Sequence, residues 1–258
     1  MTLALLAMSH SPLLEHAELD DEVSGELEAA FAHARRFVHD FDPDVVVNVA
    51  PDHYNGFFYR LMPAFCIGYA AESIGDYGSQ KGRLNVPEDL ARALAETVIG
   101  DGIDLSVSLD MQVDHGAVQP VEIIYGDITA KPFVPVFINS VAPPFTPVQR
   151  VRLLGESLGR HLATLDNARA AVIELHLDRP WPDEPAGPHD QLGAAGRISA
   201  EVKRDFAFNH GALAGAYLGH VDSDRAGNRT ELTGMSRQVR NARAPDFVLA
   251  WQAGDSRA

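Results

Sequence analysis

The chain has 258 residues, of which 46% are hydrophobic and 22% are charged, and its formal net charge is −15. This length suffices for one large domain with its own core, and the composition is ordinary for a globular protein. The acidic balance argues against nucleic acid and membrane surfaces as partners. The single cysteine, Cys66, excludes an intrachain disulfide and a cysteine-rich metal site. The apolar run at residues 3–8 lacks a basic leader and is too short to span a membrane, so we expect a cytoplasmic protein.

Short apolar runs alternate with longer helical patterns along the first two-thirds of the chain. Buried strands are expected at residues 3–8, 45–49, 134–138 and 171–175. Helices are expected at residues 20–41, 87–99, 119–125 and 147–165, two of which open on a proline that suits the first helical turn. Continuous apolar strands fit a sheet that is covered on both faces. The alternation therefore predicts an α/β fold with a largely parallel central sheet flanked by helices.

The chain after residue 176 has a different character. Residues 1–176 carry 25 acidic and 11 basic side chains, whereas residues 177–258 carry 11 and 10. This second part is rich in polar residues, proline and glycine, and only residues 247–251 have the pattern of another strand. We therefore expect a single domain with its core at 1–176 and a divergent, partly disordered C-terminal segment at 177–258.

Three of the 11 histidines lie in sequences that are typical of a functional site. His10 follows the first predicted strand and His53 the second, and open parallel sheets bind ligands beyond the carboxyl ends of their strands. His115 lies in a Gln-Val-Asp-His-Gly sequence. Asp52 and Asp114 directly precede His53 and His115, where a carboxylate could orient an imidazole or, alternatively, serve in a turn or cap.

Two imidazoles and one carboxylate on one face of a metal ion form the facial triad of non-haem Fe(II) oxygenases. His10 and His53 would supply the two nitrogens of such a site. The residues by themselves do not select iron over zinc or manganese.

Six segments of the chain resemble those of one family, the type II (class III) extradiol ring-cleavage dioxygenases, which include the β-subunit of protocatechuate 4,5-dioxygenase. These segments are Ser9-His-Ser-Pro12, Ala50-Pro-Asp-His-Tyr-Asn-Gly-Phe-Phe-Tyr59, Met62-Pro-Ala-Phe-Cys66, Ile74-Gly-Asp-Tyr-Gly78, Met111-Gln-Val-Asp-His-Gly116 and Pro135-Val-Phe-Ile-Asn139. The resemblance covers roughly residues 1–172.

The resemblance implies an enzyme of aromatic catabolism that uses Fe2+ and O2 to open the ring of a 3-substituted catechol next to its diol. It implies that His10 and His53 are metal ligands, that His115 is the proton donor, and that the protein is a homo-oligomer. This chemistry needs a base beside a catechol hydroxyl and an acid near the oxygen that departs.

The resemblance ends near residue 173. The family carries a second catalytic histidine in a Gly-Gly-Leu-Ser-His pattern, whereas this chain continues as Glu174-Leu-His-Leu-Asp178 without the glycines. His176 is the positional candidate for the proton acceptor. The third metal ligand, a carboxylate, is unassigned among Glu174, Glu201 and Glu231. The change indicates either divergence or a shifted reading frame, and it predicts a weakly active enzyme.

Two rival hypotheses stay open on the sequence. The first is a non-catalytic relative that keeps the fold and binds a ligand or partner without turnover. The second is a different metal-dependent hydrolase on the same scaffold. The intact histidines favour the dioxygenase, while the altered C-terminal part favours the first rival.

Overall fold

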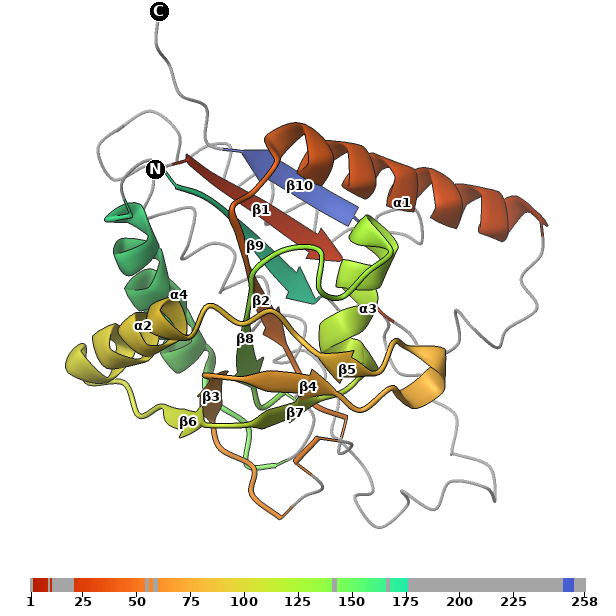
Figure 1. Cartoon of the computed structure of the whole chain (residues 1–258). Coiled ribbons are helices and arrows are strands. Elements are labelled where there is room, and N and C mark those ends of the chain that lie inside the picture. Colours follow the sequence, from red (N-terminus) through yellow and green to blue (C-terminus); the bar gives the residue numbers. More distant parts are fainter. Residues whose placement is uncertain are drawn as a thin grey trace, which may run out of the picture.

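The structure is a computed structural model that describes residues 2–8, 10, 21–53, 56–57, 60–140, 143–165, 168–175 and 248–252 (Figure 1). Four helices are described, α1 (Asp21–Phe41), α2 (Glu88–Gly100), α3 (His115–Tyr125) and α4 (Val148–Ala163). The strands of the main sheet are β1 (Thr2–Met8), β2 (Val45–Ala50), β3 (Phe65–Gly68), β6 (Ser106–Ser108), β8 (Phe133–Ile138), β9 (Arg169–Leu175) and β10 (Val248–Gln252). A small sheet is formed by β4 (Ala71–Ser73), β5 (Gly82–Arg83) and β7 (Met111–Val113).

The main sheet has seven strands in the order β10-β1-β9-β2-β8-β3-β6. Its centre is parallel, because β9 pairs in parallel with both β1 and β2, and β2 pairs in parallel with β8. Antiparallel pairs lie toward the edges, between β1 and β10 and between β8 and β3. The prediction of an α/β fold with a largely parallel central sheet is therefore confirmed.

Helices cover both faces of this sheet, with α1 and α3 on one side and α2 and α4 on the other (Figure 1). Successive side chains of a strand point to opposite faces. Val47 and Val49 accordingly pack in the cluster that contains the apolar sides of α2 and α4, whereas Val46 packs in the cluster with α1 and α3. This two-sided burial explains why the central strands are continuous apolar runs rather than alternating ones.

The four expected strands and the late strand at 247–251 are all present, within two residues of the expected bounds. The helix expected at 119–125 begins earlier, at His115, and its predicted start was wrong. The Asp114 side chain caps α3 by accepting the Gly116 N–H at 2.9 Å, so Pro120 lies inside the helix rather than at its first turn. The expected disorder within 177–258 concerns residues that, β10 apart, lie outside the described ranges. In the described part of the chain, no helix is both long and apolar enough to cross a membrane.

Leu158→Ala is expected to lower the free energy of unfolding by about 2–5 kcal/mol. Leu158 is fully buried where α4 packs against the sheet, so truncation removes apolar contacts and leaves a cavity. Urea unfolding would measure the loss. Leu153→Ala, on the same helix but with 43% of the residue exposed, is the matched control, and an equal loss in both variants would contradict this packing.

Candidate metal centre

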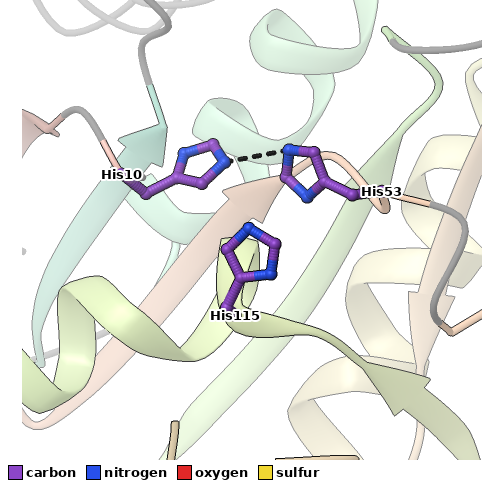
Figure 2. Close-up of side chains that lie close together, drawn as sticks. All are labelled: His10, His53 and His115. Carbon is purple, nitrogen blue, oxygen red and sulfur yellow. Dashed lines mark hydrogen bonds between the residues drawn. The ribbon is translucent and has the colours of Figure 1, made fainter. Parts of the chain in front are cut away.

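The carboxyl edge of the parallel strands brings His10 and His53 together. His10 follows β1 and His53 follows β2, and these two strands run parallel on either side of β9. The Nε2 atoms of the two rings are 3.0 Å apart (Figure 2). His10 is buried and His53 is half-buried. The structure thus brings together the two histidines that the sequence placed after these strands, while their role as metal ligands stays a prediction.

His115 joins this pair from a third segment, the first residue of α3. Its ring centroid lies 5.6 Å from that of His10 and 4.6 Å from that of His53, and it is nearly stacked on His53 with an interplanar angle of 24°. Each of the three residues offers a ring nitrogen, and these atoms all lie within 4.8 Å of one another. The three histidines that the sequence singled out therefore form one cluster (Figure 2).

Asp114 orients His53 rather than the neighbouring His115. Its Oδ2 accepts the His53 backbone N–H at 2.6 Å and lies 3.2 Å from His53 Nδ1. An ionised carboxylate can only accept, so this contact places the imidazole proton on Nδ1 and leaves the Nε2 lone pair toward His10. Burial alone would raise the pKa of Asp114, but the hydrogen bonds from His53 outweigh it and hold the pKa below its ordinary value.

Asp52 shapes the loop that carries His53. Its two carboxylate oxygens accept the backbone N–H groups of Gly56, at 2.7 Å, and Phe57, at 3.3 Å. Burial, reinforced by the negative charge of Asp114, raises the pKa of Asp52 to about 6. Asp114 thus holds the His53 imidazole, and Asp52 accepts the N–H groups of the turn that follows it.

The carboxylate that contacts the His115 ring is Asp76, which the sequence analysis missed. Asp76 Oδ1 accepts the His115 backbone N–H at 2.7 Å, and Oδ2 lies 2.7 Å from His115 Nδ1. The only signal in the sequence was the family-like segment Ile74-Gly-Asp-Tyr-Gly78, to which no role had been assigned.

Gly116 allows His53 to approach the start of α3. A Cβ atom at this position would lie 2.8 Å from His53 Cε1 and 2.9 Å from Asp114 Oδ1, distances that force a displacement. In the Asp114-His115-Gly116 sequence, Asp114 therefore orients the His53 ring, and Gly116 leaves the space that this ring occupies.

Gly116→Ala is expected to displace the His53 ring and to weaken metal binding by about 10–100-fold, the usual cost of disturbing a group that orients a ligand. The measurement is a competition titration with a metal chelator. Gly100→Ala is the matched control, because a Cβ there meets nothing within 4 Å. Unchanged metal affinity in Gly116→Ala would contradict the close packing.

The histidine cluster fits a divalent metal ion. Two nitrogens that bind one first-row metal at right angles, each at about 2.1 Å, are separated by about 3.0 Å, and the His10–His53 separation matches this. His115 Nε2 is buried without a hydrogen-bond partner among the described residues. His176 and the side chains of Glu174, Glu201 and Glu231 lie outside the described part of the chain, so the third ligand and the proton acceptor stay predictions.

Fold, site and sequence together define the class of protein. Residues 4–174 match the family described as the catalytic LigB subunit of aromatic ring-opening dioxygenase, and the chain belongs to this family.

Particular relatives share much of the sequence. The 2,3-dihydroxyphenylpropionate/2,3-dihydroxicinnamic acid 1,2-dioxygenase of Rhodococcus globerulus is 59% identical over 166 residues, covering 64% of this chain and 53% of that protein. The protein of the same name from Mycolicibacterium gilvum is 47% identical over 247 residues, covering 86% of this chain and 78% of that protein. One from a Rhodococcus species is 57% identical over 209 residues, covering 80% of this chain and 67% of that protein.

The matches extend further along the chain than the motifs, whose resemblance to the family ended near residue 173. The chain spans about half the length of the Rhodococcus globerulus relative. The match to the Mycolicibacterium gilvum relative covers 86% of the chain, so it extends past residue 176 into the segment where no resemblance had been recognised. Identity is lower over this longer match than over the shorter one.

Proposed function

We propose that the protein opens the aromatic ring of 2,3-dihydroxyphenylpropionate and its unsaturated analogue 2,3-dihydroxycinnamate with O2, at an Fe2+ ion held by His10 and His53. The observation that carries this proposal is the 3.0 Å separation of two imidazole nitrogens at the carboxyl edge of the sheet, beside the buried Nε2 of His115. The names of the relatives supply the substrate class.

The metal would be held on one face by the two imidazoles, which leaves other positions for substrate and O2. When bound, Fe2+ supplies a site at which catecholate and O2 lie side by side and exchange electron density. Asp114 keeps the lone pair of His53 Nε2 directed at that position, because its carboxylate holds the opposite nitrogen of the ring.

His115 is suited to the proton transfer that ring opening requires. One of its nitrogens is taken by Asp76, and the other points toward His10 and His53 (Figure 2). A catechol that lies beside the His10–His53 pair would place one of its hydroxyl oxygens near this second nitrogen. His115, which is buried like His10, would donate a proton to an oxygen atom of the substrate as the ring opens, and both atoms of O2 would end in the product.

The direct test is to load the full chain with Fe2+ under anaerobic conditions and then to add 2,3-dihydroxyphenylpropionate and air. We expect the yellow ring-opened product, at a rate below that of the relatives described above, because the Gly-Gly-Leu-Ser-His pattern of the family is absent after residue 173. A monohydroxylated analogue, which lacks the diol, should stay colourless. Absence of product with a fully loaded protein would reject the proposal.

The rival hypotheses gain no support from the structure or the relatives. A non-catalytic relative would not need three converging histidines, and each of the relatives described above carries the name of a dioxygenase. A hydrolase on this scaffold has no counterpart among those names. We also propose that the metal is iron rather than another divalent ion, and that the protein is a homo-oligomer.

A further inference from the structure

The mechanism proposed above leaves the Asp76 carboxylate, which is largely shielded from solvent, without a role. Asp76 contacts His115 twice, through the backbone N–H and through ring atom Nδ1, each at 2.7 Å. The pair is largely inaccessible, with 3% of the His115 side chain and 14% of the Asp76 side chain exposed. Each carboxylate oxygen therefore contacts the same histidine, in a setting where water competes little; Oδ1 also lies 3.5 Å from the Ser79 hydroxyl.

The small sheet delivers Asp76 to this position. Strands β4 and β7 pair in parallel, with Ser73 opposite Val113, and the Ile74 N–H donates to the Val113 carbonyl at 3.0 Å. The chain segments that leave the two strands therefore start side by side. Asp76 comes three residues after the end of β4, and His115 two residues after the end of β7.

The turn that carries Asp76 has an unusual backbone. Gly75 and Gly78 have φ values of 73° and 82°, and Tyr77 between them has a φ of 45°, a region that costs free energy for a residue with a side chain. The turn is held by the Ser79 N–H, which donates to the Asp76 carbonyl at 2.9 Å. The Tyr77 ring meets the His115 ring edge-on at 5.0 Å. This strained turn thus contacts His115 with two consecutive side chains.

We infer that Asp76 is a positioning residue, which fixes the tautomer and the orientation of His115 for the proposed reaction. An ionised carboxylate accepts hydrogen bonds and donates none, so its contact with Nδ1 requires the proton to be on Nδ1. The Nε2 atom then faces His10 and His53 with a free lone pair in the neutral ring, and it can take up and deliver a proton there. The role of Asp76 in catalysis rests on the proposed function, whereas its effect on the His115 tautomer does not.

A structural role alone would not require both oxygens. The start of α3 is already capped by Asp114, which accepts the Gly116 N–H. The His115 N–H needs a single acceptor, and an asparagine oxygen would satisfy it as well. Only the second oxygen of Asp76, on Nδ1, selects between the two ring tautomers. Asp76→Asn therefore separates the two roles.

In Asp76→Asn, we expect the amide oxygen to stay on the His115 backbone N–H, which can only donate. The amide NH2 then faces Nδ1, which must become an acceptor, and the proton moves to Nε2. Imidazole 15N chemical shifts of the metal-free protein, recorded well above the ordinary histidine pKa of about 6.5, report the tautomer directly. The parent should show protonated Nδ1, and the variant protonated Nε2. Asp110→Asn is the matched control, because this exposed carboxylate pairs with Arg83 and not with a histidine.

Kinetics give a second readout. Asp76→Asn should lower kcat by about tenfold or more, up to the loss of about 10²–10⁴ typical of removing the acid–base group itself, with little change in KM or in iron content. In a His115→Phe background the same substitution should cost nothing further, because Asp76 acts through His115. An equal loss of kcat in the parent and in the His115→Phe background would overturn the inference. Protonated Nε2 in the parent would also overturn it, and this measurement does not depend on whether the variant folds. Failure of the proposed function would show differently, as an iron-loaded parent without ring cleavage but with the expected tautomer.

Discussion

His53→Ala should leave a folded protein that neither retains iron nor opens the substrate ring. The substitution removes one of the two nitrogens that lie 3.0 Å apart at the sheet edge. Loss of a group that merely orients a ligand already costs about 10–100-fold in metal affinity, so the loss of the ligand itself should exceed that range. The fold should persist, because Asp114 keeps its hydrogen bonds to the backbone of residue 53 and to Gly116.

The measurement is the iron content after anaerobic loading and desalting, combined with a circular dichroism spectrum. His10→Ala should behave in the same way, since it removes the other nitrogen of the pair. His33→Ala is the control, because this histidine is exposed on α1. If both ligand variants hold iron as well as the parent does, the assignment of His10 and His53 is wrong.

His115→Phe should retain iron but lose turnover, unlike His53→Ala, which should lose both. Phenylalanine keeps the ring volume against His53 but removes both nitrogens, so the proton donor disappears while the His10–His53 pair stays. The rate of ring cleavage should fall by about 10²–10⁴, the range typical of a general acid or base. The Asp76 carboxylate still accepts the backbone N–H of residue 115, which limits the structural cost.

Iron content and the rate of product formation, measured on the same preparation, test this separation. His33→Phe is the matched control, an identical substitution at an exposed position of α1. Loss of iron from His115→Phe would make this residue a ligand and would contradict the proton-transfer role.

The parts of the fold that the sequence predicted are those with long, unambiguous patterns. Continuous apolar runs identified the central strands, since both faces of the sheet are covered. The positions of His10 and His53 followed from the same pattern, because each comes directly after such a strand. The small sheet was not predicted, since strands of two or three residues are too short to show a period.

The partners of the histidines were beyond the reach of the sequence. Asp76 lies 39 residues before His115, and only the parallel pairing of β4 with β7 brings them together. Asp114 was expected to serve an imidazole, but its ring partner is His53, 61 residues away. Adjacency along the chain does not identify this partner, because consecutive residues at a helix start point in different directions.

A crystal structure of the full chain grown anaerobically with Fe2+, with anomalous data collected at the iron edge, tests the central claim most directly. We predict one strong anomalous peak at about 2.1 Å from Nε2 of both His10 and His53, close to the usual metal–imidazole distance. His115 would lie near the ion without binding it, its Nδ1 still held by Asp76. An iron ion bound instead between Asp76 and Asp114, or no ion at the His10–His53 pair, would contradict the account.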